Sequence, residues 1–158
     1  MTAQEILDSL KPVFGEAILE SKLEIAQPWI SIAPNKTKAI CSHLREHSSL
    51  QFDYMMCLSG VDAGAGKLAV VYHLASMTQK HKIVLKAFCT RENPHVQSVS
   101  SVWGTAEWHE REAYDMVGIM FDEHPDLRRI LCPDDWEGHP LRKDYKVPEF
   151  YQGMKVPY

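Results

Sequence analysis

Long apolar runs and an export signal are absent from this sequence. Nowhere do 18 apolar residues stand together, and the first residues, MTAQEILDSLK, contain no basic region followed by an apolar stretch. A membrane-spanning helix needs about 20 largely apolar residues, and a secretory signal needs a basic region before an apolar one. We therefore expect a chain that is not secreted and does not cross a membrane by itself.

An excess of positive charge is also absent. The 158 residues include 17 Lys and Arg against 21 Asp and Glu, which gives a formal net charge of -4. Nucleic acids and anionic lipid surfaces are attracted by clustered positive charge. We expect neither as a direct partner, so any contact with a membrane would be made through other proteins.

Cysteine is scarce, and its spacing is unlike that of a metal site. The four cysteines are Cys41, Cys57, Cys89 and Cys132, and they form no C-x-x-C pair. Iron–sulfur and zinc sites usually contain closely spaced cysteine ligands. We expect no iron–sulfur or zinc ligation by these cysteines, and we expect most of them to be small core residues.

A possible zinc motif without cysteine lies at residues 43–47. Their sequence, HLREH, fits the H-x-x-E-H pattern of inverted zinc peptidases. A helix would place His43 and His47 on one face, with Glu46 beside them. Such an enzyme also needs a third ligand and a substrate cleft. A zinc hydrolase is therefore kept as an alternative function.

Helical and strand-like patterns alternate along the chain. They predict an α+β fold with a small mixed or antiparallel sheet, about three helices packed on it, and a long extended C-terminal tail. Thr2 and Glu5 form a capping box, and Pro12 is expected to end the first helix. The glycine-rich SGVDAGAGK at 59–67 predicts a hairpin connection. In chain order we expect a helix up to Pro12, strands near 17–25 and 29–32, a helix from 35 or 37 to 47–49, strands at 52–58, 68–76 and 82–89, and a helix at 99–114.

The last predicted helix carries a charged face. Glu107, Arg111 and Asp115 follow one another at intervals of four, which suits ion pairing along a helix. Glu110 and Glu112 add further negative charge. The face is either a solvated surface, where each pair contributes about 0.2–1 kcal/mol, or a polar patch that contacts another surface.

The final 40 residues, 119–158, show no clear helix or strand pattern. They nevertheless hold five of the nine prolines and six of the fifteen aromatic residues. A disordered tail is usually poor in aromatics, whereas aromatic and arginine side chains often carry interface energy. We therefore predict an α+β domain at 1–118 followed by a partner-binding tail at 119–158.

Two adjacent stretches carry a specific resemblance. WHEREAYDMVGIMFDEHPDLRRIL (108–131) and PDDWEGHPLRKDY (133–145) closely resemble the C subunit, or 30 kDa subunit, of proton-pumping NADH:quinone oxidoreductase, respiratory complex I. VDAG (61–64), VVYHLAS (70–76) and RENP (91–94) resemble the same family. The resemblance covers most of the chain from about Phe52 onward.

The resemblance implies a structural subunit without catalytic residues of its own. In such a complex, FMN, iron–sulfur clusters and quinone would be bound by other subunits, and NADH dehydrogenase activity with proton translocation would belong to the assembly. The chain would be peripheral, on the cytoplasmic side of the cell inner membrane, and would contact chiefly the D subunit, with B and I nearby. The residues we expect at the partner interface are Glu110, Arg111, Glu112, Asp115, His124, Arg128, Arg129, Trp136, Pro140, Leu141, Arg142, Lys143, Asp144 and Tyr145.

A second alternative stays within the same kind of assembly. The chain could be the equivalent subunit of a ferredoxin-, F420- or hydrogenase-linked membrane complex. The electron donor is chosen by modules that this chain is not expected to contact. The co-purifying subunits would therefore distinguish these possibilities.

Overall fold

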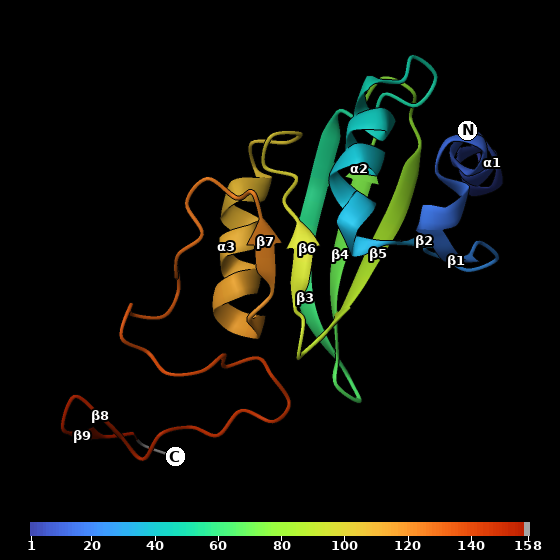
Figure 1. The fold of residues 1–158 in the computed structure, drawn as a ribbon. Coiled ribbons are helices and arrows are strands. Elements are labelled where there is room, and N and C mark those ends of the chain that lie inside the picture. The colour runs from blue at the N-terminus through green and yellow to red at the C-terminus, as the bar shows by residue number, and fades with distance from the viewer. Residues whose placement is uncertain (157–158) are drawn as a thin grey trace.

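The computed structural model describes residues 1–156 and places a five-stranded mixed sheet at the centre of the molecule (Figure 1). The strand order is β1-β2-β5-β4-β3, and β2 and β5 are the parallel pair. The helices are α1 (Ala3–Phe14), α2 (Thr37–Glu46) and α3 (Ala106–Val117). The strands of the sheet are β1 (Ile18–Lys22), β2 (Trp29–Ile32), β3 (Tyr54–Gly64), β4 (Lys67–Ala75) and β5 (Lys82–Thr90). The predicted α+β class is confirmed.

One face of the sheet is covered by α2 and α3 (Figure 1). Leu68, Val70 and Tyr72 alternate along β4 and are fully buried on this face, as expected for a strand with one side in the core. Gly60 on β3 lets α3 approach closely, since a Cβ there would lie 2.9 Å from the Cβ of Ala113. The sheet therefore fixes the position of α3, from which the candidate site is built.

The first helix starts as predicted and ends later. Thr2 and Glu5 form the expected capping box. The expectation that the helix ends at Pro12 is wrong, because α1 continues to Phe14 with Pro12 inside it. Pro12 lies in the last turn, where its missing N–H removes one hydrogen bond to exposed Asp8.

The hairpin between β3 and β4 is tighter than predicted. We expected residues 59–67 to form the connection, but β3 extends to Gly64 and β4 begins at Lys67. Gly64, Ala65 and Gly66 make the turn, with φ values of 81°, 50° and 75°. Glycine tolerates this left-handed backbone, so two glycines shorten the loop and the preceding residues join the strand.

The third helix begins seven residues later than predicted. Residues 95–97 form strand β6 (His95–Gln97), and turns lead from there to Ala106. Val99, Val102 and Trp103 are buried in these turns, and the Trp103 indole donates to the carbonyl of Phe52 at 3.0 Å. Their helical spacing therefore reflected packing of turns on the core, and not a helix.

The packed region extends past the predicted boundary at Gly118. Strand β7 (Met120–Asp122) pairs in parallel with β6, and Ile119 and Phe121 are buried in the core. Beyond Asp122, the described part of the tail runs along α3 and then away from the sheet, with the short hairpin β8 (Phe150–Tyr151) and β9 (Met154–Lys155) near its end (Figure 1). Pro157 and Tyr158 lie outside the described residues. A separate partner-binding tail stays a prediction.

None of the helices within residues 1–156 combines the length and the apolar character needed to span a bilayer.

Candidate functional site

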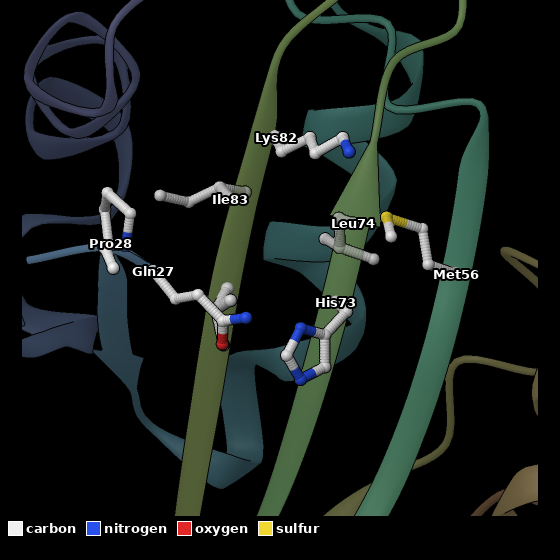
Figure 2. Close-up of a pocket in the computed structure, with 9 residues that line it drawn as sticks. Gln27, Pro28, Met56, His73, Leu74, Lys82 and Ile83 are labelled. Atoms are coloured by element: carbon white, nitrogen blue, oxygen red, sulfur yellow. The ribbon is translucent and has the colours of Figure 1, made fainter.

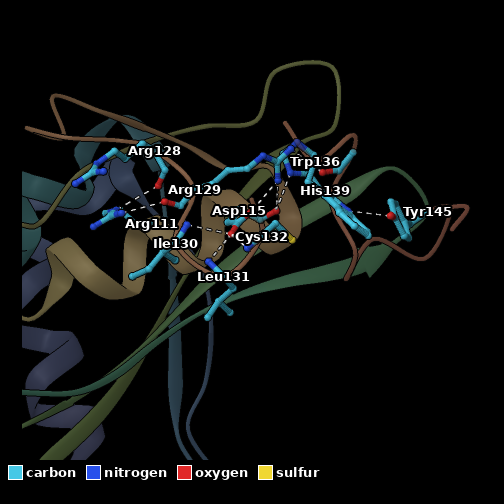
Figure 3. A network of polar contacts seen from close by, with 11 residues as sticks. Arg111, Asp115, Arg128, Arg129, Ile130, Leu131, Cys132, Trp136, His139 and Tyr145 are labelled. Carbon is cyan, nitrogen blue, oxygen red and sulfur yellow. Dashed lines mark hydrogen bonds and ion pairs between the residues drawn. The ribbon is translucent and has the colours of Figure 1, made fainter. Parts of the chain in front are cut away.

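The carboxylate of Asp115, near the end of α3, receives four hydrogen bonds from the tail (Figure 3). Its Oδ2 accepts from the backbone N–H groups of Ile130, Leu131 and Cys132 at 3.1, 2.8 and 2.8 Å. Its Oδ1 accepts from Arg129 Nη1 at 2.6 Å. Burial opposes ionisation of Asp115, but these donors outweigh it and lower its pKa below the ordinary value. A charged carboxylate therefore holds this part of the tail; we call the contact the Asp115 anchor.

Arg111, one turn earlier on α3, binds the tail through carbonyl groups. Its Nε and Nη2 donate to the carbonyl oxygens of Arg128 and Arg129 at 3.2 and 2.9 Å. Its guanidinium also lies 5.3 Å from the ring centroid of Trp108, a cation–π distance. Buried backbone groups need partners, and α3 supplies them here to a stretch of tail that joins no strand.

The C-terminal end of α3 is covered by residues from further along the tail. Gly118 follows the helix with a left-handed φ of 77°. Arg142 donates from Nε to the carbonyl of Val117 at 2.6 Å and from Nη2 to that of Gly118 at 3.3 Å. The last carbonyls of a helix have no intrahelical partner, and a cation there is favoured by the helix dipole. A side chain at position 118 would overlap the Arg142 guanidinium, so the cap requires glycine.

A second contact joins the tail to the β3–β4 hairpin. Asp62 accepts from the N–H of Lys143 at 2.9 Å and from the Arg91 guanidinium. Arg91 also donates from Nη1 to Asp144 at 2.8 Å. The bond from Lys143, with those from Gly64 and Arg91, outweighs burial and lowers the pKa of Asp62 to about 2. Three separate stretches that carry the family resemblance therefore meet at Asp62.

Glu110 forms a buried polar cluster on the inner side of α3. Its carboxylate accepts from the Ser98 hydroxyl at 2.6 Å and from the N–H of Val99 at 2.7 Å. His124 Nε2 lies 3.9 Å away, but it donates to the carbonyl of Glu107, while Nδ1 accepts from a backbone N–H. This pattern describes a neutral imidazole. Burial raises the pKa of Glu110 to about 7, although the bonds from Ser98 and Val99 oppose the change.

Aromatic side chains pack together in the outer part of the tail. The Trp136 indole donates to the hydroxyl of Tyr145 at 3.0 Å. The ring centroids of Trp136 and Tyr151 are 4.9 Å apart, which is within the range of a favourable aromatic pair. The β8–β9 hairpin is therefore held against Trp136.

The predicted site residues fall into three groups by exposure. Those buried within this chain are Glu110, Arg111 and Asp115. Those partly buried are His124, Arg129, Trp136, Pro140, Arg142 and Tyr145. Those exposed are Glu112, Arg128, Leu141, Lys143 and Asp144. Glu110, Arg111 and Asp115 are buried and make their described contacts inside the chain. Partner contact stays a prediction for the whole set.

The charged face of α3 is also different from a solvated surface. Asp115 pairs with Arg129 of the tail, and not with Arg111. Glu107 offers its backbone carbonyl to His124. The interpretation as a solvated face is therefore wrong for the buried members, while Glu112 is exposed.

Sequence reasoning did not find the contacts of Asp62, Arg91, Gly118 and His139. All four lie inside the quoted stretches that carry the resemblance, so the signal was present without a partner being assigned. His139 donates from Nδ1 to the backbone carbonyl of Asp115 at 3.0 Å. Contacts to main-chain atoms leave no complementary side chain in the sequence, so the partner of His139 could not be found there.

His43 and Glu46 of the H-x-x-E-H motif lie on α2, and His47 directly follows the helix. The rings of His43 and His47 are 5.0 Å apart between centroids. Within residues 1–156, His, Cys, Asp and Glu side chains form no group of three that could hold a metal ion. The third ligand that a zinc hydrolase would need is thus not found in the described chain.

A separate pocket lies at one end of the sheet (Figure 2). Its lining includes His73 and Lys82 from β4 and β5, together with Gln27, Met56 and apolar residues. General acid–base and nucleophilic catalysis require groups matched around a substrate. No carboxylate, hydroxyl or thiol lines this pocket, so its residues do not form a recognisable catalytic set.

Comparisons with known proteins agree with the resemblance seen in the sequence. A family model described as "Respiratory-chain NADH dehydrogenase, 30 Kd subunit" matches residues 30–151. The C subunit of NADH-quinone oxidoreductase from Chloroherpeton thalassium is 53% identical over 151 residues, covering 94% of this chain and 63% of the relative. The C subunit from Chlorobium phaeobacteroides is 47% identical over 154 residues, covering 96% and 93%. The chain thus spans less than two thirds of the first relative and nearly all of the second.

Solved structures share the fold. A trypsin-resistant fragment of Nqo5 aligns with a TM-score of 0.64 at 24% identity, covering 80% of this chain and all of the fragment. A chain of the membrane-bound sulfane sulfur reductase, an archaeal respiratory membrane complex, aligns with a TM-score of 0.73 at 21% identity, covering 91% and 85%. The family resemblance predicted from the sequence is confirmed: the chain belongs to the 30 kDa subunit family of the respiratory-chain NADH dehydrogenase.

Proposed function

We propose that this chain is a non-catalytic structural subunit of the peripheral arm of a proton-pumping NADH:quinone oxidoreductase, where it scaffolds the quinone-reducing module. Family membership supports the assembly, and the internal contacts of α3 support a structural role. In this proposal FMN, the iron–sulfur clusters and quinone are bound by other subunits. The chain lies on the cytoplasmic side of the inner membrane and contacts chiefly the D subunit, with the B and I subunits nearby.

The observation that carries the proposal is that the tail is held by the folded domain and still exposes large apolar side chains. Asp115, Arg111 and Asp62 hold its backbone. Large apolar side chains along the tail remain 52–65% exposed, namely Leu131, Leu141, Val147, Phe150 and Met154. Exposed apolar residues are ordinary when they are scattered singly, but several on one segment indicate a contact surface. A rigidly held segment also loses less conformational entropy when a partner binds.

The test replaces three of these apolar residues together, in the full-length chain expressed in cells that assemble the complex. Leu141→Ser, Phe150→Ser and Met154→Ser remove large side chains that are 61%, 61% and 65% exposed, so folding of the chain itself should change little. Loss of interface anchors commonly costs about 2 kcal/mol or more, or roughly a 30-fold weaker association. We expect less intact complex on native gels and lower NADH:quinone reductase activity in the membranes.

The matched control places serine at exposed apolar residues outside the tail. Val13 and Met77 are 58% and 59% exposed, and their replacement should leave complex content unchanged. Normal complex content in the tail variant would contradict the proposal. Mass spectrometry of the subunits that co-purify with the unmodified chain would identify the electron-input module directly.

A further inference from the structure

A pocket opens between Trp136 and the β8–β9 hairpin, in the part of the tail furthest from the sheet. Its walls include three aromatic residues, Trp136, Phe150 and Tyr151. The pairing of Trp136 with Tyr151 and the turn at Gln152 keep these walls in place. Phe150 is 61% exposed, so one aromatic wall remains open to another molecule.

The polar part of the same pocket is acidic. Asp135 and Glu137 line it, and no lysine, arginine or histidine does. Asp135 accepts from the Tyr151 hydroxyl at 2.9 Å and from the Gln152 amide at 3.1 Å. Both donors are uncharged, and in residues 1–156 neither acid takes part in an ion pair. The pocket thus carries two negative charges that this part of the chain does not neutralise.

We propose that this pocket receives an arginine side chain from the neighbouring subunit to which the tail binds. The inference rests on the proposed function, and it specifies the chemistry of the contact. Aromatic faces attract a cation, and a planar guanidinium both stacks on such faces and donates to carboxylates in its plane. Each oxygen of Asp135 has further lone pairs beyond its present bonds. Aromatic walls together with two acids therefore suit arginine better than the compact ammonium group of lysine.

The first experiment removes the pocket charges within the assembled complex. The double variant Asp135→Asn, Glu137→Gln keeps side-chain shape and deletes both negative charges. We expect the affinity of the variant chain for the rest of the complex to fall by about ten-fold, because a desolvated charge pair contributes strongly to association. We also expect this affinity to depend less on salt concentration. Asp134→Asn is the matched control, since this exposed acid is adjacent to the pocket but does not line it. It should behave as the unmodified chain.

The second experiment identifies the occupant. A photoreactive benzoylphenylalanine at position 150 retains an aromatic wall and, on illumination of the complex, couples to its nearest neighbour. We expect mass spectrometry to find a partner-subunit peptide in which an arginine lies at or beside the coupled residue. A peptide without arginine, or one with lysine in its place, would overturn the assignment.

The outcomes separate this inference from the proposed function. In one outcome, the chain with serine at 141, 150 and 154 fails to assemble, while the Asp135→Asn, Glu137→Gln variant binds the complex as the Asp134→Asn control does at every salt concentration. In that case the pocket assignment is wrong and the scaffold function stands. If both sets of variants assemble normally, both proposals are wrong.

Discussion

The replacement Asp115→Asn is expected to release the start of the tail from α3. Asparagine has nearly the same shape as aspartate, but it carries no charge and replaces one carboxylate oxygen with an NH2 group. If the remaining oxygen faces the three backbone N–H groups, the new NH2 group faces the guanidinium of Arg129. If the amide is turned round, the three N–H groups lose their acceptor. Neither orientation satisfies both sets of donors.

The magnitude follows from the burial of this pair. Asp115 is fully buried and the side chain of Arg129 is 13% exposed. A hydrogen bond to a charged group contributes about 1.5–3 kcal/mol, and removal of one member of a buried ion pair costs about 3–5 kcal/mol. Arg129 keeps its bond to the carbonyl of Gly138, so we expect a loss near the lower limit, about 3 kcal/mol.

Limited trypsin digestion measures this loss at the start of the tail. Trypsin cleaves after arginine, and the carbonyl groups of Arg128 and Arg129 are held by Arg111 in the closed tail. When opening is fast compared with cleavage, the cleavage rate follows the equilibrium population of the open form. A loss of about 3 kcal/mol then corresponds to roughly a hundred-fold faster cleavage after these residues. Urea unfolding followed by tryptophan fluorescence would report the accompanying change in global stability.

Glu112→Gln serves as the control, because it removes one negative charge from an exposed position of the same helix. Its cleavage rate should stay within about two-fold of the unmodified chain, as expected for a surface substitution. If Asp115→Asn were cleaved no faster than this control, the carboxylate would not be what holds the tail.

Two further substitutions test other parts of the site. Gly118→Ala should lower the melting temperature by about 2–8 °C, because a left-handed backbone with a Cβ costs about 1–2 kcal/mol and the added group meets Arg142. Gly104→Ala, which has open space around it, should change the melting temperature little, and equal melting temperatures for the two variants would contradict this account. Glu110→Gln should abolish a pH dependence of the stability of the fold. In the unmodified chain, burial raises the folded-state pKa of Glu110 from 4.5 to about 7. Between these two pH values the folded protein holds a proton that the unfolded chain releases, so stability decreases as pH rises through this window. Urea midpoints at pH 5 and pH 8 measure the change, and an identical decrease in the variant would show that Glu110 is not its source.

The strands of the sheet and the start of the first helix were predictable because their causes are local. Alternating apolar residues in β4 and the capping box at Thr2 act within a few positions of one another. The start of α3 was misplaced because Val99, Val102 and Trp103 have helical spacing but are buried by turns. Apolar spacing indicates which residues face a core, and several backbone shapes can satisfy it.

The candidate site was predictable in membership more than in role. The resemblance identified Glu110, Arg111 and Asp115 as members, but the spacing of Arg111 and Asp115 suggested pairing along the helix. Their actual partners are mainly backbone N–H and carbonyl groups in distant segments. Any residue except proline supplies both of these groups, so apart from the charge of Arg129 nothing in the tail sequence marks the position at which Asp115 binds.

The reliance on backbone groups has a consequence for how the tail meets its partner. Asp115 and Asp62 bind N–H groups of the tail, and Arg111 binds its carbonyls. The path of the tail is therefore set in part by three side chains of the folded domain, together with the tail side chains of His124, Arg129, His139 and Arg142 that bind α3. Tail side chains outside these contacts are not needed for docking onto α3. Side chains such as Leu131 and Leu141 can then face outward, and substitutions at these positions should change the affinity for a partner without changing the path of the tail.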